Sequence, residues 1–323
     1  MNKLRLLQVC NVGRIVGGTA ACAWTITRAL PEFEHVVAFL SEVTDETRSA
    51  FAHARIERWS RCLPSLVDAQ RPDVVILHNI GGKQRMSRRI VTLQYVHSAG
   101  TRAPADRTVY CSRWLSEQMG RSPDDVLYQG VPRPVVGEEP RSCDRDGRLV
   151  IGRICTPTAR KWPRSMLAFY RQLAECAPQA EWEFVGCPGD LQSELSDACG
   201  GRTRYFAAGW NARSRLWNWD ALLYHNPEVI ESFGRTVAES LRAGCIPIVD
   251  RRGGFIEQVT PETGFLCGTV GEFCESVARL QKAELRRRMS AKGRGDADQR
   301  FSIIRFRSDL LARMREAATR WAL

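Results

Sequence analysis

Short apolar runs alternate with helical stretches along almost the whole of this 323-residue chain, and this alternation limits the folds open to it. Runs typical of buried strands occupy 4–10, 35–40, 73–78, 90–97, 107–112, 125–130, 148–155, 181–186, 203–209, 219–224, 245–249 and 263–267. Stretches suited to crossover helices occupy 18–30, 112–120, 163–177 and 234–244. Continuous apolar strands joined by helices predict parallel α/β sheets covered on both faces.

A stretch rich in proline, glycine and charge interrupts this pattern at 132–147. Such a segment is typical of an interdomain linker. We therefore expect two doubly wound, Rossmann-like domains that face each other across a cleft, at 1–140 and 147–300. The tail 301–323 is expected to form one amphipathic helix that packs back towards the N-terminal domain, with its apolar face at Phe301, Ile304, Leu310, Leu311 and Met314.

The net charge of +11 and the pI of about 9.3 favour polyanionic partners, nucleic acid or an anionic membrane surface. An excess of arginine is also what a GC-rich genome produces, since only five of the 47 basic residues are lysines. No stretch reaches 18 apolar residues, and the N-terminal residues do not resemble a signal peptide, so we expect a cytoplasmic protein. The twelve cysteines lack metal-site spacing and mostly lie in apolar runs, which predicts reduced, buried thiols.

The most informative segment is 227–249, which combines a loop, a helix, a glycine turn and a buried strand. Glu231 and Glu239 are separated by seven residues, and Gly234 and Gly244 stand where a helix start and a helix C-cap need conformational freedom. Glu231 then lies in the loop and Glu239 in the helix, about 8 Å apart along its axis. Two carboxylates placed in this way can hold two hydroxyl-bearing parts of one extended ligand.

Two further loops follow strands, where ligands of open α/β sheets bind. The first carries Gly17 and Gly18 at the start of a helix, which suits either an anion or only a tight turn. The second carries Arg153 and, eight residues later, Lys161. Arg and Lys that converge at a strand end suit a diphosphate, although the same pair can be ordinary surface charge.

His78 and His97 each stand at the end of a predicted strand, where a loop that lines a ligand site begins. A single histidine is more often a structural hydrogen-bonding group than a catalyst. No serine–histidine–aspartate or cysteine–histidine arrangement accompanies either of them. Their placement therefore marks them as candidates without defining a reaction.

Charged clusters remain outside these loops. Lys83, Arg85, Arg88 and Arg89 lie close together, and 279–307 holds ten basic residues against three acidic ones. Each cluster suits a solvated surface or a contact with a phosphate backbone. Two Asp-x-Asp tripeptides, 144–146 and 296–298, do not follow strands, and we interpret both as surface charge rather than as a metal site.

Taken together, these motifs resemble glycosyltransferase family 4, the retaining sugar-nucleotide transferases with the GT-B fold. The resemblance covers most of the second domain and several loops of the first. It is carried by the Glu-(seven residues)-Glu segment with Phe233 and Gly234, by Gly152-Arg153 with Lys161, and by the motifs at 185–189, 209, 219–220, 253–257 and 264–266.

The resemblance implies a role for each matching position. Arg153 and Lys161 should bind the donor diphosphate, and Glu231 should contact the donor sugar near its anomeric carbon. The Phe233 and Gly234 amides should touch sugar or phosphate, and Glu239 should hold the ribose. The first domain is expected to place Gly17 and Gly18 near the phosphates and acceptor, and His97 at the donor sugar. The resemblance implies a nucleotide-sugar donor, such as a UDP- or GDP-sugar. Since Arg153 and Lys161 would supply positive charge at its diphosphate, we expect that no metal is required.

The chain departs from the family pattern at Glu228, where a serine is usual, and at Arg160 and 209–211. The resemblance leaves the acceptor open. A lipid-linked or cell-surface saccharide reached at an anionic membrane, a small molecule, and hydroxymethylated DNA in a phage-infected cell each fit part of the pattern. The second of these does not explain the charge. A non-catalytic nucleic-acid-binding protein on a transferase scaffold is a further alternative, and no obligate protein partner is inferred.

Overall fold

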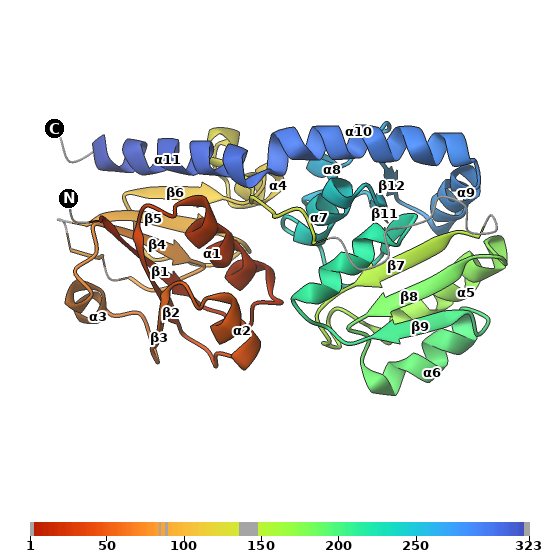
Figure 1. The fold of residues 1–323 in the computed structure, drawn as a ribbon, viewed down its shortest axis with the longest axis horizontal. Helices are drawn as coiled ribbons and strands as arrows, with labels where there is room; N and C mark the ends of the chain where they lie inside the picture. The colour runs from red at the N-terminus through yellow and green to blue at the C-terminus, as the bar shows by residue number, and fades with distance from the viewer. Residues whose placement is uncertain (1–2, 84, 88–89, 136–147, 320–323) are drawn as a thin grey trace. The chain divides into compact units, whose positions relative to one another are not determined.

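The structure of the protein is a computed structural model that describes residues 3–83, 85–87, 90–135 and 148–319. The chain divides into two compact units (Figure 1). The first comprises Met1–Pro132 together with Arg300–Leu323, and the second comprises Arg133–Gln299. Each unit is built around its own six-stranded sheet.

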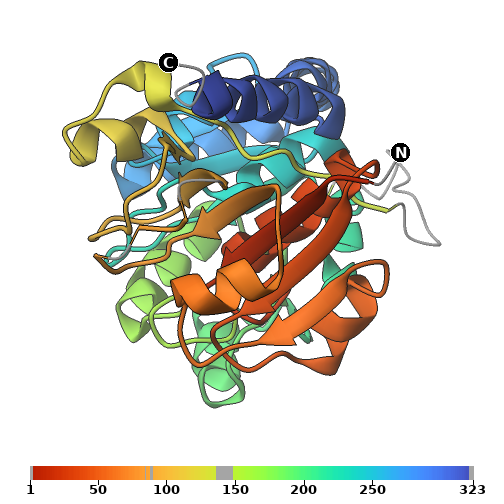
Figure 2. The same ribbon diagram turned by 90° about the vertical axis from the view of Figure 1, so that its left-hand side faces the viewer.

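In the first unit, all strands pair in parallel in the order β3-β2-β1-β4-β5-β6. Figure 2 shows the ribbon with this unit facing the viewer. The strands are β1 Arg5–Cys10, β2 Glu34–Phe39, β3 Arg55–Arg58, β4 Val74–His78, β5 Val91–Val96 and β6 Arg107–Tyr110. The helices are α1 Gly18–Ala29, α2 Asp45–Ala50, α3 Pro64–Ala69, α4 Arg113–Gln118, the 3₁₀ turn η1 Pro123–Asp125, and α11 Ile303–Thr319.

The two faces of this sheet are covered by different parts of the chain. One face packs apolar side chains of β1, β2 and β4 against Val67 of α3. Helix α11 contacts α1, β5 and β6 and buries Phe306, Leu310, Met314 and Ala317. Ile304, expected on the apolar face of the tail helix, is instead 83% exposed because it lies off this stripe.

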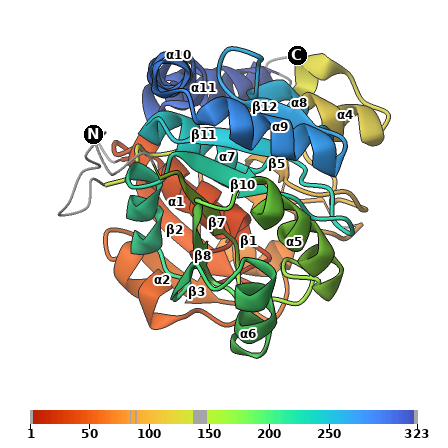
Figure 3. The ribbon, with the colours of Figure 1, turned by 90° about the vertical axis from the view of Figure 1, so that its right-hand side faces the viewer.

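The second unit repeats the topology, with parallel strands in the order β12-β11-β10-β7-β8-β9 (Figure 3). Its strands are β7 Val150–Ile154, β8 Glu181–Val185, β9 Thr203–Phe206, β10 Ala221–Tyr224, β11 Ile246–Asp250 and β12 Phe265–Cys267. Its helices are η2 Arg164–Met166, α5 Leu167–Cys176, α6 Gly189–Ala198, η3 Asn211–Trp217, α7 Arg235–Ala243, α8 Phe255–Gln258, α9 Val270–Leu280 and α10 Ala283–Phe301.

Both sheets have the strand order of a doubly wound nucleotide-binding fold. The order reverses between β1 and β4 in the first unit and between β7 and β10 in the second. Two Rossmann-like α/β domains were expected from the alternation of strands and helices, and the structure confirms them. The cleft expected between them stays a prediction.

Two local expectations were wrong, and one strand was missed. Residues 125–130 form no strand, and only an isolated bridge joins Val126 to Tyr110. Strand β3 was not anticipated, since its sequence RIER carries the charges of an edge strand. The cysteines are not all reduced, because Cys176 at the end of α5 and Cys274 in α9 form a disulfide with Cα atoms 5.7 Å apart.

Within the described residues, no helix combines the length and apolar character needed to cross a membrane. The expected cytoplasmic location stays a prediction.

Strand β7 leaves no room for a side chain at Gly152. A methyl group there would lie 2.0 Å from Cδ2 of Trp219, whose indole is held by a 2.8 Å hydrogen bond to Glu183 Oε2. We expect Gly152→Ala to lower the free energy of unfolding by about 1–3 kcal/mol, as overpacking does. Gly189→Ala is the control, because no atom lies within 4 Å of its added methyl. Equal melting temperatures for the two variants would contradict this close approach.

Candidate functional site

The predicted donor-site residues of the second unit converge on its topological switch point. Arg153 lies in β7 and Lys161 follows that strand, whereas Glu231 follows β10, which is the neighbour of β7. In a doubly wound sheet, ligands bind beyond the carboxyl ends of the strands at this reversal. The fold therefore brings together residues that are 70 or more positions apart in the sequence.

Lys161 and Glu231 form the centre of this cluster. The Lys161 ammonium donates to Glu231 Oε1, and the Tyr224 hydroxyl donates to the same oxygen. The Lys161 and Glu231 side chains are 14% and 21% exposed, so both can be reached from solvent. An ammonium and a carboxylate at a strand switch point offer one cationic and one anionic contact to a ligand.

Arg153 is placed differently from a surface phosphate ligand. Its side chain is fully buried and donates to the carbonyl oxygens of His225, at 2.6 Å, and Lys161, at 2.7 Å. Its guanidinium also lies 4.9 Å and 4.8 Å from the ring centroids of Trp162 and Tyr224.

Among the described residues, no acidic side chain balances the charge of Arg153. No carboxylate in the described part of the chain pairs with it, and its buried Nε has no hydrogen-bond partner there. A buried cation without a counterion is costly. An anion bound at the adjacent strand ends would offset that cost.

The loop that carries Glu231 is held by the loop after β11. The Gly254 amide donates to the Glu231 carbonyl at 2.8 Å, and a methyl group on Gly253 would lie only 2.4 Å from that oxygen. Gly253 also has a φ of +63°, which favours glycine. The Gln258 side chain donates to the Phe233 carbonyl. Backbone contacts and the Gln258 side chain thus hold the Glu231 loop in position.

Phe233 and Gly234 form the start of α7. Gly234 has a φ of +79° and caps the helix, and its α-carbon lies so close to Phe255 that a methyl group there would be 2.2 Å from the ring. The Phe233 side chain is buried. Only their backbone amides suit the contacts with sugar or phosphate that the sequence implies, and those contacts stay predictions.

Glu239 lies inside α7 and is 2% exposed. Its Oε1 accepts hydrogen bonds from Nε of Arg213, at 2.9 Å, and Nε of Arg235, at 3.0 Å. Arg213 comes from η3, and its guanidinium lies 4.1 Å from the ring centroid of Trp210. The predicted ribose ligand is therefore already paired, so a ribose would have to share or displace these arginines.

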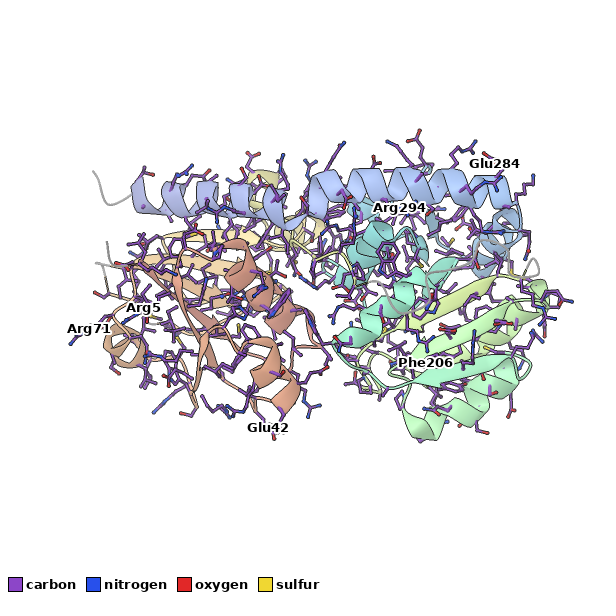
Figure 4. All side chains as sticks on the ribbon, in the orientation of Figure 1. Arg5, Glu42, Arg71, Phe206, Glu284 and Arg294 are labelled. Atoms are coloured by element: carbon purple, nitrogen blue, oxygen red, sulfur yellow. A yellow bond between two sulfur atoms is a disulfide. The ribbon has the colours of Figure 1, made fainter. Side chains whose placement is uncertain are left out.

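Another arginine stacks on an aromatic ring nearby. The Arg215 guanidinium lies 3.4 Å from the ring centroid of Phe206, which is labelled in Figure 4 at the end of β9. Two arginines of η3 thus stack on aromatic rings, Arg213 on Trp210 and Arg215 on Phe206.

In the first unit, Gly17 and Gly18 precede and begin α1, as expected. The Gly17 amide is used in a turn, where it donates to the Arg14 carbonyl at 2.9 Å. A methyl group on Gly18 would have no neighbour within 4 Å. The loop is thus a tight turn with open space beside Gly18, and its predicted role near phosphates and acceptor stays untested.

His97 belongs to a buried chain of polar side chains. Its Nε2 lies 3.0 Å from His78 Nδ1, its Nδ1 lies 3.0 Å from Gln129 Nε2, and His78 Nε2 lies 2.9 Å from Gln8 Oε1. Both ring nitrogens of His97 are therefore bonded to protein groups. A hydrogen bond to a donor sugar, as predicted from the sequence, would require one of these bonds to be exchanged.

The contact that Gln8 makes with Ala23 decides which group donates in each of these hydrogen bonds. The Gln8 amide donates to the Ala23 carbonyl at 3.1 Å, so its Oε1 accepts from His78 Nε2. Burial lowers the pKa of His78 to about 3, so the ring is neutral and its Nδ1 accepts from His97. Gln129 then donates to His97.

Cys22 lies beside the two histidines. The potential ligand atoms of Cys22, His78 and His97 lie within 4.8 Å of one another. The histidine planes are 7° apart with centroids at 5.3 Å, and with nitrogens 3.0 Å apart the rings meet edge to edge. Their nitrogens point at each other rather than at a shared third point, which fits a hydrogen bond and not a bound metal.

The basic clusters lie at the surface where they are described. Lys83 and Arg85 are exposed, whereas Arg88 and Arg89 lie outside the described residues. Arg294 and Glu284, labelled in Figure 4, lie on α10, which carries most of the basic stretch 279–307. Asp296 pairs with Lys292 at 2.9 Å, and Asp298 pairs with Arg242 at 2.9 Å, while the 144–146 tripeptide lies outside the described residues.

Sequence reasoning missed Tyr224, Arg213 and Gln258. Tyr224 was included only as part of an apolar strand, although a polar ring at a strand end that faces Glu231 is the kind of signal that could have identified it. Arg213 gave no signal of its own among 47 basic residues. Gln258 acts through a backbone carbonyl, which no motif records.

Comparison with known proteins finds similarity at the level of the fold. HepE of Anabaena, in complex with UDP, matches with a TM-score of 0.76 and 16% identity over 99% of this chain and 100% of its own. A glycosyltransferase from Rickettsia africae gives 0.75 and 13% over 98% and 99%, and sucrose-phosphate synthase from Thermosynechococcus elongatus gives 0.72 and 14% over 98% and 99%.

These likenesses, with the two doubly wound sheets, give the chain the GT-B fold of glycosyltransferases. No protein-family model matches the sequence, and no curated protein matches it.

The buried His78 gives the stability a defined dependence on pH. Its pKa is lowered on folding from 6.5 to about 3, so below pH 6.5 the unfolded chain binds a proton that the folded chain does not. Stability from this residue is therefore lost as the pH falls. Between pH 7 and pH 5, we expect the wild-type free energy of unfolding to fall by about 2 kcal/mol more than that of His78→Gln. The free energy of unfolding is measured by urea unfolding at both pH values. An equal change for the wild type and His78→Gln would contradict the lowered pKa of His78.

Proposed function

We propose that this protein is a glycosyltransferase that moves a sugar from a nucleoside diphosphate sugar to a hydroxyl group of an acceptor. The observation that carries the proposal is the Lys161–Glu231–Tyr224 cluster at the β7–β10 switch point, next to the uncompensated charge of Arg153. The similar HepE structures contain UDP or UDP-glucose, which supports a nucleotide-sugar donor for this chain.

In this proposal, Lys161 binds the donor diphosphate directly. The buried Arg153, which donates to the Lys161 carbonyl, adds electrostatic attraction for the diphosphate. Direct contact with Arg153, as the sequence implies, requires its guanidinium to exchange a carbonyl for a phosphate oxygen. Fixed cations at the departing diphosphate stabilise the charge that develops as the glycosidic bond breaks. Since Lys161 and Arg153 supply this charge, we propose that the reaction needs no metal.

The remaining residues surround the donor. Glu231 contacts the sugar near its anomeric carbon, the Phe233 and Gly234 amides contact sugar or phosphate, and Glu239 holds the ribose in competition with Arg213. We also propose Gly17 and Gly18 near the phosphates and acceptor, and His97 at the donor sugar.

Resemblance to family 4 supports retention of configuration by attack on the same face. The bond between the anomeric carbon and the diphosphate oxygen breaks, and its electron pair leaves with the nucleoside diphosphate. The acceptor oxygen forms the new bond to that carbon and gives its proton to an oxygen of the departing diphosphate.

We propose a lipid-linked or cell-surface saccharide as the acceptor. The net charge of +11 and the basic surface of α10 suit a cytoplasmic protein that makes peripheral contact with an anionic membrane. Hydroxymethylated DNA and small-molecule acceptors are distinguished by the experiment below.

Release of nucleoside diphosphate from a panel of UDP- and GDP-sugars, measured in excess chelator, tests the proposal. We expect release from one donor, and stimulation by a lipid-linked saccharide presented in anionic vesicles. Stimulation by hydroxymethylcytosine duplex DNA, but not by unmodified DNA, would identify a DNA-modifying enzyme instead. Loss of all activity in chelator, with recovery on adding Mg²⁺ or Mn²⁺, would contradict metal independence.

Substitution of Lys161 tests the diphosphate contact. We expect Lys161→Ala to lower turnover by at least about 100-fold, because a fixed cation at the leaving group is lost, while the melting temperature stays close to that of the wild type. Lys282→Ala removes an exposed lysine at the start of α10 and should leave turnover unchanged. Wild-type turnover in Lys161→Ala would rule out the proposed contact.

A further inference from the structure

Tyr224 is the last residue of β10 and is almost fully buried beside the Glu231 loop. Its hydroxyl donates to Glu231 Oε1, the oxygen that also accepts from Lys161. Burial and the neighbouring Glu231 carboxylate raise the pKa of Tyr224 above its ordinary value. The phenol therefore keeps its proton and acts as the donor of this hydrogen bond.

The ring of Tyr224 is held on two sides. The Arg153 guanidinium lies 4.8 Å from its centroid, and Phe255 packs against it edge to face at 5.1 Å. Phe255 in turn lies against Gly234, where it leaves no room for a side chain. A ring held in this way fixes the position of its hydroxyl before any ligand arrives, which is how supporting groups preorganise a site.

The two donors on Glu231 Oε1 respond differently to a diphosphate. The Lys161 ammonium is attracted to the phosphate charge and can leave the carboxylate for it. The Tyr224 phenol is neutral and buried, so a diphosphate does not draw it away from Glu231. When Lys161 turns to a diphosphate, Tyr224 remains as the hydrogen-bond donor that keeps Glu231 in place.

We infer that Tyr224 is a positioning residue, which holds Glu231 Oε1 so that the other carboxylate oxygen contacts the donor sugar. This inference rests on the proposed function, since it assigns Glu231 to a nucleotide sugar. Tyr224 contributes nothing to the binding of the nucleoside diphosphate itself. It acts on the affinity for the sugar and on turnover, and it does so only through Glu231.

Tyr224→Phe separates the hydroxyl from the ring, because the phenyl group still packs on Arg153 and Phe255. In the full-length protein, we expect the affinity for UDP, measured by calorimetry, to stay within about twofold of the wild type. The donor is the one found in the panel, and UDP-glucose is the first probe. We expect the loss in turnover multiplied by the loss in donor affinity to be about 10- to 100-fold, as for loss of a hydrogen bond to a charged group. The affinity for the donor should therefore fall relative to the affinity for UDP.

A double-mutant cycle with Glu231→Ala, which removes the accepting oxygen, tests whether the two residues act together. We expect the effect of Tyr224→Phe on donor affinity to shrink to less than about twofold in the Glu231→Ala background. The matched control is Tyr205→Phe, which removes a phenol that donates to the Gln192 carbonyl at 2.7 Å in the same unit. This control should leave turnover and both affinities unchanged.

Three results would overturn the inference. Wild-type turnover and donor affinity in Tyr224→Phe would show that the hydroxyl has no role. An equal loss of UDP and donor affinity would show a structural role only, and an undiminished effect in the Glu231→Ala background would show that Tyr224 does not act through Glu231. If the unsubstituted protein neither bound nor cleaved any nucleotide sugar, the proposed function would fail first and this inference with it.

Discussion

A buried positive charge at the end of β7 organises the second unit. The Arg153 guanidinium binds the carbonyl oxygens of two loops, the one that carries Lys161 and the one that follows β10, so it ties together both sides of the strand switch point. No acidic side chain of the described residues neutralises it. The unit thus accepts an electrostatic cost at the place where a doubly wound sheet binds ligands, and such costs are typical of functional sites.

In the first unit, by contrast, the buried polar side chains hydrogen-bond to one another. Gln8, His78, His97 and Gln129 satisfy one another in a single chain, and the two histidines need neither an acidic partner nor a metal to be accommodated. One unit therefore holds a buried charge that no carboxylate of the described residues pairs with, and the other holds buried polar side chains that hydrogen-bond to one another. A ligand that carries negative charge is attracted to the former, whereas the latter offers hydrogen bonds only by exchange.

The sequence predicted the fold well because strand burial and helix periodicity are local properties. It predicted Lys161 and Glu231 after strands, whereas Arg153 lies within β7, and the strand order brought the three together. It could not predict that Arg153 is buried, that Glu239 pairs with Arg213, or that Cys176 bonds Cys274, because each depends on packing between distant segments. Residues 125–130 misled for a related reason, since an apolar run alone does not show whether a neighbouring strand is there to pair with it.

The hydrogen-bond chain of the first unit has a consequence for how this protein can diverge. Its direction is set by one carbonyl, that of Ala23, and each side chain in it must donate on one side and accept on the other. Replacing one member leaves a buried partner unpaired, at a cost of about 1–3 kcal/mol. We therefore expect these four residues to change together in evolution: Gln8, His78, His97 and Gln129. A path that replaced them one at a time would pass through less stable proteins.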